Sequence, residues 1–190
     1  MRIISGLYRG RKLNPPKGLP VRPTTDLAKE SLFNILVNRS GFEGQSVLDL
    51  FAGTGSISFE FASRGVESVV SVDLNHRCTD FISKSAQEFR VGNLYVVKAN
   101  VFQYLKSVKR KFDIIFADPP YQMEETASLP GIIFANSLLN DEGWLILEHD
   151  ASLKFQDYKG FVDVRNYGKV HFSFFQFLSE DGSSEETTIS

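Results

Sequence analysis

Four consecutive residues, Asp118-Pro119-Pro120-Tyr121, carry the clearest chemical signal in the sequence. They follow the largely apolar run 112–117, which predicts a strand that delivers the Asp118 carboxylate at its carboxyl end. This carboxylate and the Pro119 carbonyl can accept the two N–H bonds of an exocyclic amine and stabilise the positive charge that develops when its nitrogen attacks an electrophile. The Tyr121 ring offers a stacking face for a base. A rigid loop is the structural alternative, but the combination favours a catalytic site for an amino group.

A second signal is the glycine turn, residues 49–55, with the sequence Asp-Leu-Phe-Ala-Gly-Thr-Gly. Gly53 and Gly55 permit a tight turn and close approach of a ligand, in the crevice where open α/β sheets bind nucleotides. A dinucleotide would place its pyrophosphate beside the buried carboxylate of Asp49. S-adenosylmethionine instead carries a cationic amine and a sulfonium, so the sign of the charge favours this methyl donor. An ordinary strand-to-helix turn is the structural alternative.

Asp73 extends the predicted cofactor site. It ends the apolar run 69–72 and lies 18 positions after Gly55, near the offset of about 20 residues at which an acid can accept both ribose hydroxyls. Its structural alternative is a cap for the helix expected over 75–90, for which Asn75 is an equal candidate.

Asn100 follows the next expected strand. Its amide could bond the exocyclic amine of adenine, with the N–H of Val101 on a ring nitrogen, and the alternative is a cap for the helix 101–107. The other residues expected to line the cofactor are Phe51, Ala52, Thr54, Leu74 and Asp118.

From residue 45 onward, short apolar runs alternate with helix-length segments, which indicates an α/β fold with helices on both faces of a mostly parallel sheet. The expected strands are 47–51, 69–72, 94–97, 114–117 and 145–147, and the expected helices are 56–64, 75–90, 101–107 and 129–139. The runs 162–167 and 170–178 predict an antiparallel pair. This outline is typical of a Rossmann-like methyltransferase rather than of a dehydrogenase.

The first 40 residues carry eight basic and two acidic side chains, although the whole chain has a net charge of −2. The sequence of this segment predicts a hairpin over 2–14, a proline-rich loop, and a helix that starts near Thr24, Thr25 and Asp26. The positive field favours a polyanionic partner, with a solubilising arm as the alternative. The side chains expected to contact RNA phosphates are Arg2, Arg9, Arg11, Lys12 and Arg22.

The chain therefore divides into a basic extension (1–40), a methyltransferase domain (41–178) and an acidic tail (179–190) that is expected to be disordered. One cysteine and three scattered histidines predict no disulfide and no metal site. No apolar run approaches the roughly 18 to 20 residues of a membrane helix, and the first residues, 1–13, lack the apolar core expected of a signal peptide. We expect a soluble, cytoplasmic monomer.

These motifs together resemble the bacterial 16S ribosomal RNA guanine-N2 methyltransferases of the RsmD family. The matching stretches are residues 2–6 (RIISG), 9–13 (RGRKL), 22–26 (RPTTD), 48–55 (LDLFAGTG), 63–65 (SRG), 118–121 (DPPY), 147–149 (LEH) and 167–168 (YG). The resemblance implies a seven-stranded fold, S-adenosylmethionine as the donor, and as the acceptor a 16S rRNA guanine in the small subunit or its assembly intermediate. The sequence departs from the family at Asn100, where the family usually has Asp.

Three alternatives stay open at this point. The amine acceptor could belong to adenine or cytosine in DNA, or to a glutamine amide. The chain could be a non-catalytic RNA-binding factor of ribosome assembly that keeps an inherited fold. A nicotinamide dehydrogenase is the third alternative.

Overall fold

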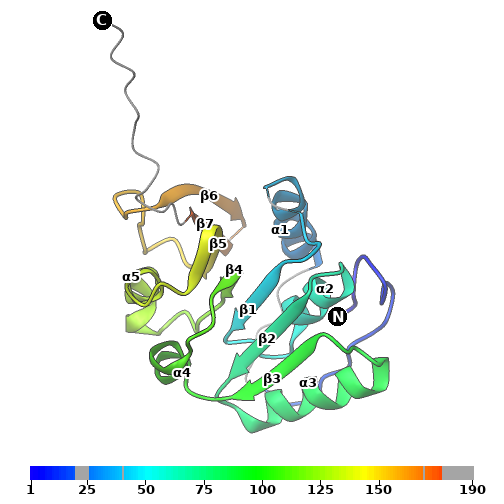
Figure 1. The fold of residues 1–190 in the computed structure, drawn as a ribbon. Coiled ribbons are helices and arrows are strands. Elements are labelled where there is room, and N and C mark those ends of the chain that lie inside the picture. Colours follow the sequence, from blue (N-terminus) through cyan, green and yellow to red (C-terminus); the bar gives the residue numbers. More distant parts are fainter. Residues whose placement is uncertain (20–25, 40, 169, 177–190) are drawn as a thin grey trace, which may run out of the picture.

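The computed structural model describes residues 1–19, 26–39, 41–168 and 170–176 (Figure 1). Its centre is a seven-stranded sheet in the order β3-β2-β1-β4-β5-β7-β6. The strands are β1 (Ser46–Leu50), β2 (Ser68–Asp73), β3 (Leu94–Lys98), β4 (Phe112–Ala117), β5 (Leu139–His149), β6 (Phe161–Tyr167) and β7 (Val170–Gln176). Strands β1 to β5 run parallel, and β7 is antiparallel to both β5 and β6. The predicted α/β architecture is confirmed.

Helices cover both faces of this sheet because the central strands are buried on both sides. They are α1 (Asp26–Arg39), α2 (Ser56–Ser63), α3 (His76–Phe89), α4 (Val101–Ser107), the 3-10 helix η1 (Glu124–Ser128) and α5 (Leu129–Ala135). One apolar cluster packs α1, α2 and α3 against one face, and a second packs α4 and α5 against the other (Figure 1).

The strand order reverses beside β1. The chain runs outward from β1 to β2 and β3, and then returns to add β4 on the other side of β1. Ligands of open α/β sheets bind at such a reversal, outside the carboxyl ends of the strands. The fold therefore places the predicted sites at the ends of β1 and β4.

Two expected element bounds are wrong. The helix expected over 129–139 ends at Ala135, and Leu139 already belongs to β5. β5 is 11 residues long and not confined to 145–147. Its early part, 140–142, is polar and largely exposed, so no apolar run marks the start of the strand.

The predicted N-terminal hairpin is confirmed and packs on the domain. Arg2 forms an antiparallel bridge with Lys12, and the Leu7 N–H donates to the Ser63 carbonyl of α2 at 2.7 Å. Ile3 and Leu13, each 1% exposed, join the same apolar cluster as α1, α2 and α3. The hairpin therefore shares its core with the sheet.

A buried ion pair anchors the hairpin. The Lys29 ammonium donates to the Arg2 carbonyl at 2.6 Å and lies 3.5 Å from a Glu60 carboxylate oxygen, with both side chains fully buried. Glu60 also accepts the N–H groups of Ile4 and Ser5 at 2.9 and 3.0 Å. Burial lowers the pKa of Lys29, and the charge of Glu60 opposes that shift. Removing Glu60 would leave a buried unpaired cation, so the pair fixes where the hairpin lies.

Gly6→Ala is expected to lower the free energy of unfolding by about 1–3 kcal/mol more than Gly10→Ala. Both glycines have a positive φ, 80° and 82°, so both substitutions carry similar backbone strain. A Cβ on Gly6 would lie 1.8 Å from the Ser63 carbonyl oxygen, whereas nothing lies within 4 Å of a Cβ on Gly10. Urea unfolding of the two variants measures the difference. Equal stabilities would contradict the close packing of the hairpin on α2.

Several predictions fall outside the described residues. They concern Arg22, the helix cap at Thr24 and Thr25, the strand end at Leu178 and the tail 179–190.

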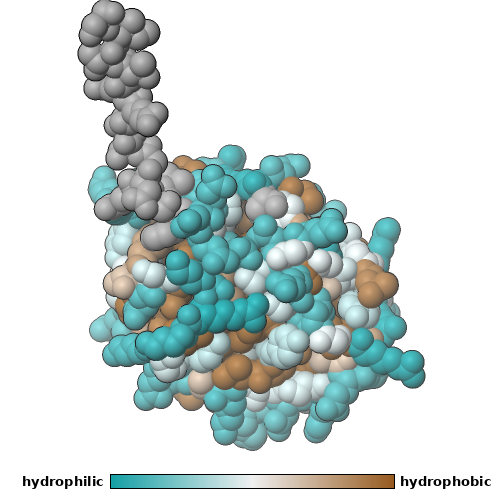
Figure 2. All heavy atoms as spheres, in the orientation of Figure 1, coloured by the Kyte–Doolittle hydropathy of each residue, from teal (hydrophilic) through white to brown (hydrophobic). Residues whose placement is uncertain are grey.

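Polar side chains cover most of the face shown in Figure 2, and brown apolar residues form separate islands among them. Exposed large apolar side chains include Leu7 at 81%, Leu27 at 71% and Leu74 at 63%, which come from different elements. Within the described ranges, no helix combines the length and the apolar character needed to span a membrane.

Candidate active site

The carboxyl ends of β1, β2, β4 and β5 meet at one edge of the sheet. Leu50 of β1 is paired with Val72 of β2 and Ala117 of β4, and Ala117 is paired with Leu147 of β5. Each of these residues is followed by a candidate site residue. After β1, β2, β4 and β5 in turn, these are Phe51, Asp73, Asp118 and Glu148.

The glycine turn adopts an unusual backbone. Phe51, Gly53 and Gly55 all have a positive φ, of 59°, 55° and 73°, and the Gly55 N–H closes the turn on the Ala52 carbonyl at 2.7 Å. For the non-glycine Phe51 such a conformation costs on the order of 1–3 kcal/mol and is typical of functional sites. The Thr54 hydroxyl contacts the Met1 sulfur at 3.3 Å, so this predicted cofactor residue is engaged with the N-terminus.

Asp49 lies inside the sheet rather than on the turn surface. It is 1% exposed, and its carboxylate accepts a hydrogen bond from the Ser58 hydroxyl of α2, which also contacts the Ser71 hydroxyl. Burial raises the pKa of Asp49 to about 7; the Ser58 hydrogen bond opposes this shift and the charge of Asp73 adds to it. In this structure Asp49 can act on a ligand through its charge rather than by contact.

Asp73 is held against the glycine turn. One carboxylate oxygen accepts the Gly53 N–H at 2.8 Å and the other accepts the Asn75 N–H at 2.7 Å. The cap of α3 is Asn75, whose side chain accepts the Arg77 N–H at 3.0 Å. Asn75, and not Asp73, therefore caps the N-terminus of α3. Leu74, 63% exposed, follows Asp73 at the same strand tip.

Asn100 caps the N-terminus of α4, which is the structural alternative to a contact with adenine. Its side-chain oxygen accepts the Gln103 N–H at 3.1 Å. An adenine amine would have to share this oxygen with the helix cap. The Val101 side chain is buried in the second apolar cluster, which leaves only its backbone as a candidate contact.

Asp118 lies beside Glu148 in the sheet register. Burial raises the pKa of Asp118 well above its ordinary value, and the charges of Glu148 and Asp49 add to the shift. Burial raises the pKa of Glu148 to about 7, against the opposing effect of the Tyr121 hydroxyl, which donates to Glu148 Oε1 at 3.4 Å. Pro119 is buried, whereas Tyr121 is 36% exposed.

The four carboxylates Asp49, Asp73, Asp118 and Glu148 form an acidic cluster that no cation of the described residues compensates. Burial is the main cause of every one of their raised pKa values, and no lysine or arginine among the described residues contributes to any of them. A cationic ligand would relieve this repulsion, whereas a pyrophosphate would increase it. The cluster therefore fits S-adenosylmethionine and opposes a dinucleotide.

The free energy of unfolding should fall as pH rises between about 4 and 7, and Asp49→Asn should make that fall shallower. In this window the folded chain retains the Asp49 proton, with a pKa of about 7, that the unfolded chain has already lost. The proton contributes at most about 1.4 kcal/mol per pH unit. Urea unfolding from pH 4 to pH 8 tests this, with the exposed Asp80→Asn as the control. Parallel pH profiles for wild type and Asp49→Asn would rule the effect out.

Four of the five predicted RNA-binding residues lie on the hairpin, and the fifth, Arg22, lies outside the described residues. Arg9 and Lys12 are exposed. Arg2 lies 3.4 Å from an Asp26 carboxylate oxygen with 64% of its side chain exposed. Arg11 donates to the Phe89 carbonyl at 3.2 Å and its guanidinium lies over the Phe89 ring, so it is partly used within the protein.

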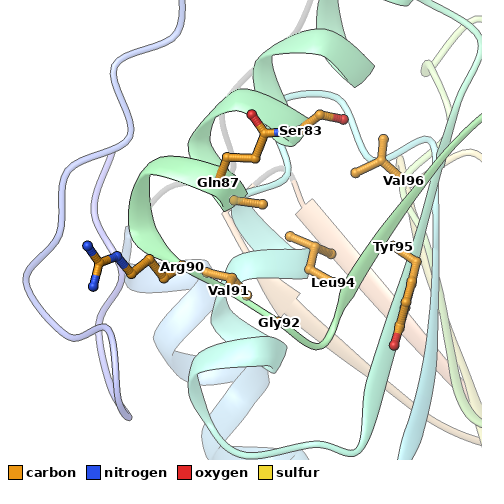
Figure 3. Close-up of a pocket in the computed structure, with 9 residues that line it drawn as sticks. Ser83, Gln87, Arg90, Val91, Gly92, Leu94, Tyr95 and Val96 are labelled. Atoms are coloured by element: carbon orange, nitrogen blue, oxygen red, sulfur yellow. The ribbon is translucent and has the colours of Figure 1, made fainter.

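An open hollow of about 570 Å³ lies away from these residues, between α3 and the edge strand β3 (Figure 3). Its lining includes Ser83, Gln87, Arg90 and Tyr95. No acid, histidine or cysteine is among its lining residues. We therefore assign the chemistry to the strand ends. Across the described part of the chain, no group of three or more His, Cys, Asp and Glu side chains is arranged to hold a metal ion.

Sequence reasoning places Glu148 and His149 at the end of a parallel strand, facing the crevice, and favours a role in stabilising nearby loops over a role as general base. It misses the position of Glu148 next to Asp118. That position comes from the β4–β5 register, in which Ala117 pairs with Leu147. That register depends on long-range pairing, which the local sequence does not reveal.

The strand order, the strained glycine turn and the acid-rich strand ends define a Rossmann-like, class I methyltransferase fold. Residues 1–176 match the family described as Conserved hypothetical protein 95, and the chain belongs to that family. The ribosomal RNA small subunit methyltransferase D of Escherichia coli (strain K12) is 34% identical over 148 residues, which cover 76% of this chain and 69% of that protein.

Solved structures agree with the fold. The yhhF protein of Escherichia coli has a TM-score of 0.82 at 26% identity, covering 94% of this chain and 98% of that chain. The Thermus thermophilus 16S rRNA N2 G1207 methyltransferase RsmC, solved with AdoMet and guanosine, has a TM-score of 0.67 at 21% identity, covering 84% of this chain and 45% of that chain. The second likeness shows the fold alone.

Proposed function

We propose that this protein is an S-adenosylmethionine-dependent methyltransferase that modifies the N2 amine of a guanine in 16S rRNA within the small ribosomal subunit. The observation that carries the proposal is the acidic cluster at the strand ends, which has Asp118 beside the glycine turn and no compensating cation in the part of the chain that the structure describes. The name of the Escherichia coli relative, ribosomal RNA small subunit methyltransferase D, supports the choice of substrate.

The residues around the glycine turn would hold the methyl donor. Asp73 would accept ribose hydroxyls in addition to the N–H groups of Gly53 and Asn75, and the exposed side chain of Leu74 would contact the adenine face. A bound cation would favour the ionised forms of Asp49 and Asp118, which would then supply negative charge to it. When bound, S-adenosylmethionine supplies an electrophilic methyl group.

The acceptor amine needs to be oriented because its lone pair is delocalised into the ring. Asp118 and the Pro119 carbonyl would accept its two N–H bonds and turn the nitrogen lone pair toward the methyl group. The same acceptors stabilise the positive charge that grows on the nitrogen, and afterwards the amine releases a proton. Tyr121 would stack on the base.

Methyl transfer from S-[methyl-³H]adenosylmethionine tests the proposal directly. The substrates are small subunits from cells that lack the protein, the naked 16S rRNA and genomic DNA. We expect label in the small subunit, recovered as N2-methylguanosine after nuclease digestion. Label in adenine, cytosine or protein, or no label in any substrate, would overturn the proposed function.

A further inference from the structure

A buried carboxylate oxygen in the active site is left without a partner. Glu148 is 4% exposed, and its Oε2 has no hydrogen-bond partner among the described residues. The other oxygen, Oε1, accepts the Tyr121 hydroxyl at 3.4 Å. An unpartnered buried oxygen is costly, which indicates that it serves a ligand that donates a hydrogen bond.

The orientation of Glu148 follows from the sheet. Ala117 of β4 and Leu147 of β5 are paired in parallel register, and both lie in the apolar cluster of α4 and α5. Because side chains alternate along a strand, the next residues, Asp118 and Glu148, share the opposite face. The repulsion between the two carboxylates agrees with that placement. Glu148 also lines a small hollow of about 10 Å³ together with Pro119 and Tyr121.

The base that these acceptors fit can be deduced from its edge. In adenine and cytosine, the ring nitrogen beside the exocyclic amine is a hydrogen-bond acceptor. In guanine, the N2 amine is flanked by two ring nitrogens, N1, which carries a hydrogen and is a donor, and N3, which is an acceptor. A row of acceptors from Asp118, Pro119 and Glu148 therefore matches the adjacent donors of guanine and meets an unfavourable acceptor on the other two bases.

We propose that Glu148 Oε2 accepts the N1–H of the target guanine and so selects guanine over adenine and cytosine. The inference rests on the proposed function, because it requires an amine held by Asp118 and Pro119. It assigns Glu148 a contact with the substrate in addition to its bond with Tyr121.

The test uses small subunits reconstituted with the target guanine either intact or replaced by 2-aminopurine. 2-Aminopurine keeps the exocyclic amine but has an acceptor in place of the N1–H. Wild-type protein should prefer guanine, in kcat/KM, by about 100-fold or more. Glu148→Gln should lose about 10- to 100-fold on guanine and much less on 2-aminopurine, so the preference shrinks. A wild-type protein that methylates both substrates equally would overturn the inference, even if the variant failed to fold.

Tyr121→Phe is the matched control, because it removes the hydroxyl that bonds Oε1 and leaves Oε2 in place. It should keep the wild-type preference for guanine over 2-aminopurine, whatever its absolute rate. If Tyr121→Phe reduced the preference as much as Glu148→Gln, Glu148 would act only by holding Tyr121 and the inference would be wrong. Failure of wild type to methylate the intact guanine would instead reject the proposed function.

Discussion

The Asp118→Ala protein is expected to transfer methyl groups about 10²- to 10³-fold more slowly than wild type, by analogy with the loss of one preorganised polar group. Asp118 is the carboxylate of the acidic cluster that belongs to the Asp-Pro-Pro-Tyr motif. Its backbone N–H donates a hydrogen bond to the Leu50 carbonyl at the end of β1. Its loss should lower kcat, because the bond to the amine strengthens as positive charge develops.

Two controls separate catalysis from folding and donor binding in this experiment. The Kd for S-adenosylhomocysteine, measured by calorimetry, should stay close to the wild-type value in Asp118→Ala. Asp141→Ala changes an exposed acid at the far end of β5 and should leave kcat unchanged. Comparable turnover in Asp118→Ala and wild type would contradict the role assigned to this carboxylate.

Binding to 16S rRNA is expected to weaken about 250-fold when salt rises from 50 to 200 mM. We assume about six phosphate contacts, each of which adds about 0.7 to the steepness of a plot of the logarithm of the binding constant against the logarithm of the salt concentration. The slope of that plot is then near −4. The exposed hairpin residues Arg9 and Lys12 carry two of those contacts in this account. Replacing both with alanine should therefore make the slope shallower by about 1.4.

Lys106 and Lys109 provide the control for the salt experiment. Both are exposed, and they lie at the end of α4 and before the start of β4, toward the amino edge of the sheet. Replacing both with alanine removes the same charge but should leave the slope unchanged. A wild-type slope near zero would exclude the hairpin from RNA binding. Equal effects of the two double variants would show a general charge effect instead.

The sequence predicts those parts of the fold that depend on local patterns. Buried strands such as β1 appear as apolar runs, and residues with special backbone requirements, such as Gly53 and Gly55, mark the turn that follows. The Asp-Pro-Pro-Tyr motif can be placed at a strand end because the apolar run before it is unambiguous. These features also set the strand ends side by side, since parallel strands present their carboxyl ends at one edge.

Features that depend on distant contacts could not be predicted. A lysine in a helix is expected to be exposed to solvent. Lys29 is instead buried against Glu60, which lies 31 residues further along the chain. The polar start of β5 is a strand because Leu139 pairs with Phe112, which no local pattern reveals. The unpartnered oxygen of Glu148 likewise follows from strand register and from packing of the loop that carries Tyr121.

The most direct test of the central claim is a crystal structure with S-adenosylhomocysteine and guanosine monophosphate bound. The account predicts that the Asp118 carboxylate and the Pro119 carbonyl oxygen lie within about 3.2 Å of the guanine N2 atom, with that nitrogen facing the sulfur. A structure in which the Asp118 side chain points away from the sulfur, or in which the glycine turn excludes the adenosyl group, would contradict it.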